Sequence, residues 1–358
     1  MRYFREHIAR MQGYVPGEQP KKEEGYIKLN TNENPYPPSP KVIQALHTAC
    51  TGDLRLYPDP MADQVRDKAA AVFGVRREQV LVGNGSDELL SMAIRSFAGE
   101  REQVVYPHPT YTLYETLIRI QNARPVTVDF PDDYSLPGGM AVEGARVTLL
   151  SNPNSPSGTM IPVEKVAYLA GKVDGVLIAD EAYVDFADEH SLPLIDTYDN
   201  LIVLRSFSKS FSLAGMRMGI SFADESLIEG MAKVKDSYNV NRLSIVAAEA
   251  ALDDMAYMRA HAERIKATRT RLIEALRDLG FYVYPSQANF VLAKIKKPRA
   301  SELYQELRRR KILVRYFPQR RLEDCLRITV GTKEEIDQLL SELGKIVMAN
   351  VSMGSSGL

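Results

Sequence analysis

A single lysine, Lys209, lies in a small polar stretch, RSFSKSFS, directly after an apolar run of strand length at 201–204. Serines occupy alternate positions around it, and Arg217 follows eight residues later. Alternating serines are also typical of a solvated strand face. The alternative is that the hydroxyls and Arg217 hold an anion beside a lysine that does covalent chemistry. The rest of the chain decides between these two interpretations.

A carboxylate follows another apolar run. Asp180 comes directly after 176–179, so we expect it at the carboxyl end of a buried strand, the edge of an open α/β sheet where ligands bind. A buried carboxylate needs a cationic or hydrogen-bonding partner. Tyr183 follows three residues later. The alternative role for Asp180 is to cap a helix.

Other strand ends carry groups that suit a phosphate and a flat ring. GNGS (83–86) lies between a strand and a helix start, where unpaired N–H groups bind anions, although a tight turn capped by Ser86 explains it equally well. Tyr111 follows a strand and a proline and can stack on a ring, although ordinary packing is more common. A lysine nucleophile, a buried carboxylate and a phosphate site together predict pyridoxal 5'-phosphate (PLP) as cofactor.

Eight motifs occur in order from about residue 29 to residue 332: LNTNENPYPPSP, YPDP, GNGSDELL, PTY, NPNSPSGT, ADEAYVDF, RSFSKSFSLAGMRMG and CLRITVGT. These motifs make the chain resemble the fold-type I PLP-dependent aminotransferases of class II, and among these the histidinol-phosphate aminotransferase family. The resemblance extends over nearly the whole chain. The S-x-S-K and A-G-x-R-x-G pair, with D-E-A-Y upstream, carries most of the resemblance.

The resemblance implies how the cofactor is held. Lys209 forms the Schiff base and moves a proton, Asp180 pairs with the pyridinium nitrogen, Tyr183 hydrogen-bonds the ring hydroxyl, and Tyr111 stacks on the ring. The implied phosphate ligands are the amides of Ser86 and Asp87, the hydroxyls of Ser206 and Ser208, Arg217, and the partner subunit's Tyr57. A ligand from the neighbouring subunit implies a homodimer with shared active sites.

The resemblance also implies substrate contacts. Arg327 matches the arginine that binds the α-carboxylate of the amino acid substrate; histidinol phosphate lacks this carboxylate but carries a phosphate, and a bidentate arginine suits either anion. Arg315 and Tyr14 fall where the family contacts substrate. Arg315 could instead be a surface strand residue, and Tyr14 could simply pack its arm on the body of the protein. One position departs from the family pattern N-N-P-T-G, because the chain has Asn154 followed by Ser155. We expect Asn154 to bond the ring hydroxyl of the cofactor, with Ser155 as the alternative.

Strands and helices alternate from about residue 41, and several strands are almost continuously apolar. This pattern predicts an α/β fold with a mostly parallel sheet between helices, and the resemblance implies seven strands. After about residue 250 the pattern changes to a small α+β unit. We expect an N-terminal arm at 1–40 that joins the small domain, a large PLP-binding domain at 41–250, a small domain at 251–348 and a disordered tail at 349–358.

Composition limits the classes of partner and site. The chain has 358 residues, of which 45 are basic and 46 acidic, and its net charge is −1. This balance gives no overall electrostatic attraction to nucleic acid. No apolar run approaches the roughly 20 residues of a membrane span, and the five histidines show no metal-ligand spacing. The absence of a signal-peptide pattern and of a disulfide framework predicts a cytoplasmic protein.

The predicted reaction moves the amino group of L-histidinol phosphate to 2-oxoglutarate, giving imidazole acetol phosphate and glutamate, in histidine biosynthesis. An aromatic amino acid aminotransferase, or a decarboxylase of a phosphorylated amino acid, uses the same fold and the same residues. A non-enzymatic PLP-binding regulator is disfavoured. Every catalytic position of the family except the one at Asn154 and Ser155 is filled, and no DNA-binding module is visible.

Overall fold

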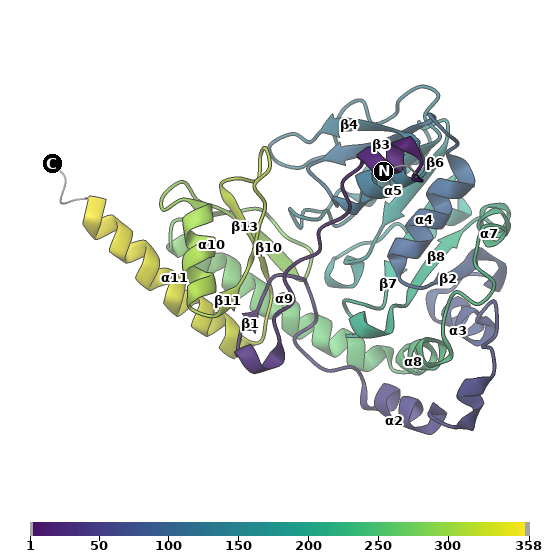
Figure 1. The fold of residues 1–358 in the computed structure, drawn as a ribbon, viewed down its shortest axis with the longest axis horizontal. Coiled ribbons are helices and arrows are strands. Elements are labelled where there is room, and N and C mark those ends of the chain that lie inside the picture. The colour runs from purple at the N-terminus through teal and green to yellow at the C-terminus, as the bar shows by residue number, and fades with distance from the viewer. Residues whose placement is uncertain (1–2, 355–358) are drawn as a thin grey trace.

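The computed structural model describes residues 3–354 and places a seven-stranded sheet at the centre of a large domain (Figure 1). The strands lie in the order β2-β8-β7-β6-β5-β3-β4. They are β2 (Val80–Gly83), β3 (Gln103–His108), β4 (Arg124–Asp129), β5 (Val147–Ser151), β6 (Val176–Asp180), β7 (Leu201–Ser206) and β8 (Gly219–Ala223). Only β8 runs antiparallel to its neighbours, so the predicted fold class is confirmed.

The central strands are apolar throughout because helices cover both faces of the sheet. Along β6, Leu177 and Ala179 belong to one core cluster, whereas Val176 and Ile178 belong to the other. Helices α4 (Ser86–Phe97), α5 (Leu113–Ile120) and α7 (Glu225–Ala232) pack on one face, and α3 (Asp63–Phe73), α6 (Val163–Ala170) and α8 (Arg242–Leu252) on the other. This burial on two sides is what a parallel sheet requires.

A smaller unit follows α8. Its four antiparallel strands lie in the order β12-β13-β10-β9. Its elements are α9 (Met255–Asp278), β9 (Tyr282–Val283), β10 (Phe290–Lys294), α10 (Ala300–Arg309), β11 (Ile312–Leu313), β12 (Arg315–Tyr316), β13 (Cys325–Thr329) and α11 (Lys333–Gly354). Helix α11 continues through 349–354, part of the tail expected to be disordered, and residues 355–358 lie outside the described part of the chain.

The N-terminal arm crosses from one unit to the other (Figure 1). Helix α1 (Glu6–Arg10) lies against α5, and Arg5 donates to the carbonyl of Ile120 at 3.2 Å. Strand β1 (Ile27–Lys28) then pairs in parallel with β11 of the small unit. The arm next leads into α2 (Pro40–Ala49), so residues 29–39 pass between the two units.

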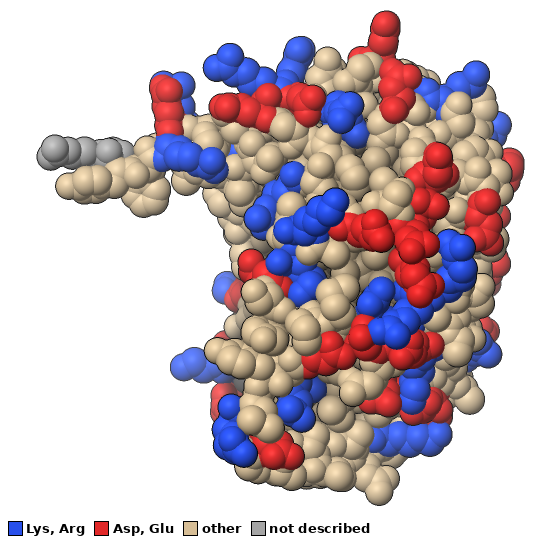
Figure 2. Space-filling view, turned by 90° about the vertical axis from the view of Figure 1, so that its right-hand side faces the viewer, with Lys and Arg blue, Asp and Glu red and all other residues tan. Residues whose placement is uncertain are grey.

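Short 3₁₀ segments complete the chain: η1 (Lys22–Glu24), η2 (Gly52–Arg55), η3 (Arg77–Gln79), η4 (Val184–Phe186), η5 (Leu192–Asp196) and η6 (Ala214–Met216). Basic and acidic side chains are interspersed on the face shown in Figure 2. Ion pairs such as Arg77 with Asp67, at 3.2 Å, join neighbouring elements of the large domain. Within residues 3–354, no helix is long and apolar enough to cross a membrane.

Candidate active site

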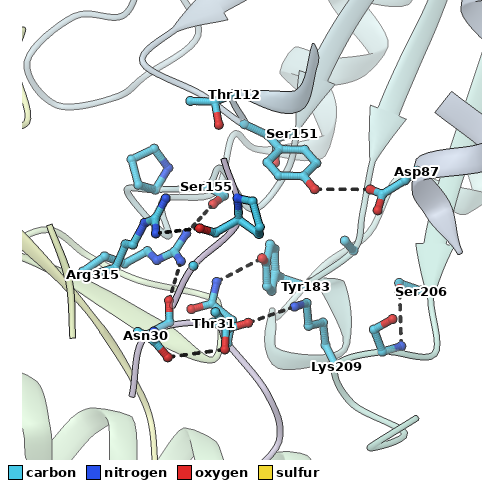
Figure 3. A pocket seen from close by; sticks show the side chains of 18 of the residues that line it. Asn30, Thr31, Asp87, Thr112, Ser151, Ser155, Tyr183, Ser206, Lys209 and Arg315 are labelled. Carbon is cyan, nitrogen blue, oxygen red and sulfur yellow. Dashed lines mark hydrogen bonds between the residues drawn. The ribbon is translucent and has the colours of Figure 1, made fainter. Parts of the chain in front are cut away.

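A cavity of about 440 Å³ lies where the carboxyl ends of β5, β6 and β7 meet the arm and the small domain (Figure 3). Register brings the strand ends together, since Ser151 is opposite Asp180 and Ser206 is opposite Gly219. Twelve of the predicted site residues line the cavity: Tyr14, Ser86, Asp87, Tyr111, Asp180, Tyr183, Ser206, Ser208, Lys209, Arg217, Arg315 and Arg327. The fold therefore assembles residues that are scattered over most of the sequence.

Lys209 enters the cavity from the turn after β7. Its Nζ donates to the carbonyl of Thr31 at 3.4 Å and lies 5.6 Å from the ring centre of Tyr183. No carboxylate forms an ion pair with it in the described part of the chain. An amine held by one long hydrogen bond, beside an aromatic ring, is free to react with a carbonyl carbon.

Asp180 ends β6 and is 4% exposed. Its carboxylate accepts from the Tyr114 hydroxyl at 2.7 Å and from the Ala182 N–H at 3.3 Å. Burial raises its pKa to about 6, although the hydroxyl of Tyr114 acts in the opposite direction. No basic side chain among residues 3–354 pairs with it, so a buried anion lacks its cation. A protonated pyridine nitrogen supplies that charge.

Two glycines allow Arg217 and strand β8 to come close to the start of α4, whose residues Ser86 and Asp87 line the cavity. Gly85 precedes α4 with a φ of 86°, and a Cβ there would lie 2.6 Å from Nη2 of Arg217. A Cβ on Gly219 would lie 2.4 Å from the backbone nitrogen of Ser86. The first turn of α4 therefore presents its free N–H groups to the cavity, which is the geometry of a phosphate site.

Arg217 adds a positive charge at this point. Its backbone is left-handed, with a φ of 52°, and its guanidinium lies 3.2 Å from Asp87 and 3.5 Å from the hydroxyl of Ser208. Ser206 accepts from the N–H of Ser208 at 3.1 Å. Ser206 and Ser208 thus face the cavity, and Ser210 is buried against Asp185, so these serines do not form a solvated strand face.

Two tyrosines frame the space between Lys209 and α4. Tyr111 donates to Asp87 at 3.2 Å and contacts Tyr114 and Tyr14 edge to face. Burial raises its pKa, so the hydroxyl stays protonated and its ring offers a flat surface to a ligand. The Tyr183 hydroxyl accepts from the side-chain amide of Asn32 at 3.0 Å.

Two arginines face each other at the small-domain side. Arg315 and Arg327 occupy opposite positions on β12 and β13. Arg315 donates to the carbonyls of Val15 and Pro16 at 3.3 and 3.4 Å, and Arg327 donates to Ser155 at 3.1 Å. Burial lowers the pKa of Arg327, and its Nε is buried without a partner. Neither arginine pairs with a carboxylate among the described residues, so both are available to a substrate anion.

Asn154 is the site residue that the structure places elsewhere. It is 1% exposed and absent from the cavity lining, and its amide accepts from Thr110 at 2.7 Å and donates to Ser157 and Pro109 at 2.9 and 3.3 Å. Both N–H groups of this amide are used, so it has no donor left for a ring oxygen in the cavity. Ser155 lines the cavity instead.

Tyr57 also lies outside the cavity of its own chain. It is 77% exposed and stacks on Tyr238, with ring centres 4.4 Å apart. This exposure leaves Tyr57 free to contact a second molecule.

Sequence analysis missed several residues that hold the site together. Tyr114 binds Asp180, and Thr31 and Asn32 contact Lys209 and Tyr183. Tyr114 lies three residues after Tyr111, one helical turn away, which was a usable signal. The arm residues gave no signal beyond their motif, because their partners lie 151 and 178 positions away.

Comparison with known proteins gives the family. The family model "Aminotransferase class I and II" matches residues 24–343. Histidinol-phosphate aminotransferase 1 of a Nostoc species is 47% identical over 342 residues, covering 95% of this chain and 97% of that protein. The histidinol-phosphate aminotransferase of Citrifermentans bemidjiense is 44% identical, with 96% and 98% covered.

A solved structure agrees over the same length. The histidinol-phosphate aminotransferase of Sinorhizobium meliloti, crystallised in complex with pyridoxal-5'-phosphate, superimposes with a TM-score of 0.88 at 26% identity, covering 98% of each chain. The chain therefore belongs to the class I and II aminotransferases, and within them to the histidinol-phosphate aminotransferases.

Proposed function

We propose that this protein transfers the amino group of L-histidinol phosphate to 2-oxoglutarate, producing imidazole acetol phosphate and glutamate. One observation carries the proposal: among residues 3–354, a lysine and a buried carboxylate without a basic partner share a cavity with two arginines that have no acidic partner. Lys209 and Asp180 suit a pyridine aldehyde, and the two arginines, Arg315 and Arg327, suit the phosphate or carboxylate of a substrate.

The cofactor is pyridoxal 5'-phosphate, and the donor set fits it at both ends. Asp180 holds the proton on the ring nitrogen, while the N–H groups of Ser86 and Asp87 bind the phosphate. The hydroxyls of Ser206 and Ser208, with the guanidinium of Arg217, complete the phosphate ligands. When bound, the cofactor withdraws electrons from the carbon that carries the substrate's amino group.

The remaining roles fall to side chains around that carbon. Lys209 would take the proton from the substrate's Cα and deliver it to C4′ of the cofactor. Tyr111 stacks on the ring, Tyr183 donates to its hydroxyl oxygen, and Arg315, Arg327 and Tyr14 orient the substrate. Because one cavity serves both substrates in turn, the amino donor leaves as a ketone before 2-oxoglutarate enters, and the kinetics are ping-pong.

We further propose a homodimer in which the partner subunit's Tyr57 reaches the cofactor phosphate. An exposed apolar patch surrounds this residue: Leu54, Leu56, Tyr57 and Tyr238 are 50%, 45%, 77% and 47% exposed. Apolar clusters of this kind mark protein–protein contacts. The cytoplasmic location stays a prediction from sequence.

The test is the visible spectrum of the purified holoenzyme, recorded before and after adding L-histidinol phosphate without a keto acid. We expect the band of the lysine-bound cofactor to disappear as the amino group is transferred, and to return with 2-oxoglutarate. Lys209→Ala should lack this band and nearly all turnover. Bleaching by phenylalanine or tyrosine, but not by histidinol phosphate, would assign the enzyme to aromatic amino acids instead.

A further inference from the structure

Asn32 joins three parts of the molecule at the edge of the cavity. It lies in the arm after β1, and its side-chain nitrogen donates to the hydroxyl of Tyr183 at 3.0 Å. Its backbone N–H donates to the hydroxyl of Thr329 on β13, also at 3.0 Å. Asn289, before β10, donates to its carbonyl at 2.9 Å. Asn32, Asn289 and Thr329 are each at most 2% exposed, so water does not compete for these bonds.

The Thr329 hydroxyl fixes which way the amide of Asn32 points. This hydroxyl has one proton, and its oxygen already accepts from the backbone of Asn32. The acceptor within reach of that proton is Oδ1 of Asn32, at 3.0 Å. If the amide were reversed, the buried Thr329 proton would have no acceptor, which costs about 1–3 kcal/mol. The nitrogen of the amide must therefore face Tyr183.

This arrangement determines the direction of the Tyr183 proton. A tyrosine oxygen that accepts from an amide N–H carries its own proton on the other side. We propose that Asn32 is a positioning residue that aims the Tyr183 proton into the cavity, so that Tyr183 donates to the ring oxygen of the cofactor. This inference rests on the proposed cofactor site. It adds that Asn32 determines the direction of the Tyr183 proton, which the family motif alone does not indicate.

Two features of the chain make this orientation of Tyr183 by Asn32 important. The N–H groups of Asn154 are occupied elsewhere, so Tyr183 and the hydroxyl of Ser155, which lines the cavity and accepts from Arg327, remain as donors to the ring oxygen. Asn32 also has a left-handed backbone, with a φ of 58°, which asparagine tolerates better than most residues. The position therefore suits an amide for both its backbone and its side chain.

The test exchanges the amide for an acceptor of the same shape. Asn32→Asp keeps the bond from Thr329 but offers Tyr183 an oxygen, so the tyrosine proton should turn away from the cofactor. A hydrogen bond to the ring oxygen favours the charged form of that oxygen. We therefore expect the pH midpoint of the visible band of the bound cofactor to rise by about one unit in Asn32→Asp.

The new carboxylate also shifts the pH midpoint through its charge alone. Making the same change in the Tyr183→Phe variant separates this charge effect from the turn of the hydroxyl. Lys209, Tyr14, Tyr111 and Arg327 are the other titratable groups that face Tyr183. In Tyr183→Phe there is no hydroxyl to turn and only the charge effect remains, so adding Asn32→Asp should raise the midpoint clearly less than it does in the wild type. An equal rise in both backgrounds, or no rise in either, would overturn the inference.

Thr329 provides a test that introduces no charge. Thr329→Val removes the proton that orients the amide and should raise the midpoint, whereas Thr329→Ser should keep the wild-type value. Asn122→Asp is the matched control, because Asn122 is also left-handed, with a φ of 60°, and bonds Glu100 away from the cavity. The visible band itself reports whether Lys209 holds the cofactor, so a failure of the proposed function is seen separately.

Discussion

Asp180 makes the stability of the cofactor-free protein depend on pH. Burial raises its pKa to about 6, from 3.8 for a free side chain, so the folded state binds a proton more readily than the unfolded chain does. The free energy of unfolding should therefore fall as pH rises from about 4 to about 6, by up to about 3 kcal/mol from this group. Asp180→Asn removes this contribution because an amide does not titrate. Urea unfolding of both proteins across this range measures the difference, and parallel curves would refute it.

Arg315 should decide which substrates are accepted. It lies opposite Arg327 with no carboxylate partner in the described structure, so Arg315→Ala removes a charge-assisted bond to a substrate anion. We expect kcat/KM for histidinol phosphate to fall about 10- to 100-fold, and that for phenylalanine to change far less. Arg320→Ala is the control, since Arg320 is also in the small domain but pairs with Asp129. Equal losses on both substrates would show that Arg315 is not a phosphate ligand.

Single residues also show what sequence can and cannot predict. Lys209 and Asp180 were predictable because each lies at or just beyond the carboxyl end of an apolar strand, and these strand ends meet at one sheet edge. Asn154 was misplaced because neighbouring side chains in a loop point in different directions, which only the folded turn determines. Asn32 was missed because Thr329, which orients it, lies 297 positions away.

At the scale of elements, the start of α4 should bind the phosphate only if Gly85 stays a glycine. Gly85→Ala places a methyl group against Arg217 and also strains a φ of 86°. We expect the dissociation constant of PLP to rise at least about 10-fold, as for a lost charge-assisted bond. Equilibrium dialysis of PLP against the cofactor-free protein gives this value.

Gly74→Ala separates strain from the clash. Gly74 ends α3 with a φ of 71°, and an added Cβ would meet nothing within 4 Å. Gly74→Ala should lose about 1–2 kcal/mol of stability, because alanine is strained in the left-handed region, and Gly85→Ala should lose at least as much, because a φ of 86° with a ψ of 160° is a conformation that only glycine adopts readily. Only Gly85→Ala should lose PLP affinity. A matching loss in Gly74→Ala would mean that affinity follows stability, not the geometry of this helix start.

The order of elements was predictable to a greater extent than their contacts. Continuous apolar runs such as 176–179 indicated buried parallel strands, and the structure pairs them as parallel neighbours. The arm was harder, because residues 29–39 have no periodic pattern and take their conformation from both units. Its β1 has two residues and is visible only through its pairing with β11.

At the scale of the whole molecule, a site shared between subunits predicts that two different inactive variants complement each other in mixed dimers. Each cavity needs its own Lys209 and, in the proposed dimer, the partner subunit's Tyr57. Tyr57→Ala should bind PLP more weakly, whereas Tyr168→Ala, at another exposed tyrosine, should not. Light scattering of the wild type should give the mass of two chains.

Mixing Lys209→Ala with Tyr57→Ala chains should therefore restore activity. Every mixed dimer has one cavity with both residues intact, so random reassortment should recover about a quarter of wild-type turnover at a PLP concentration that saturates only the wild type. Lys209→Ala mixed with Arg315→Ala is the matched control, because both residues line the cavity of one chain and no mixed dimer has an intact site. No recovery in the first mixture would place Tyr57 outside the partner's cavity and leave each chain with a complete site of its own, whereas recovery in the control would show that Lys209 and Arg315 do not act in the cavity of one chain.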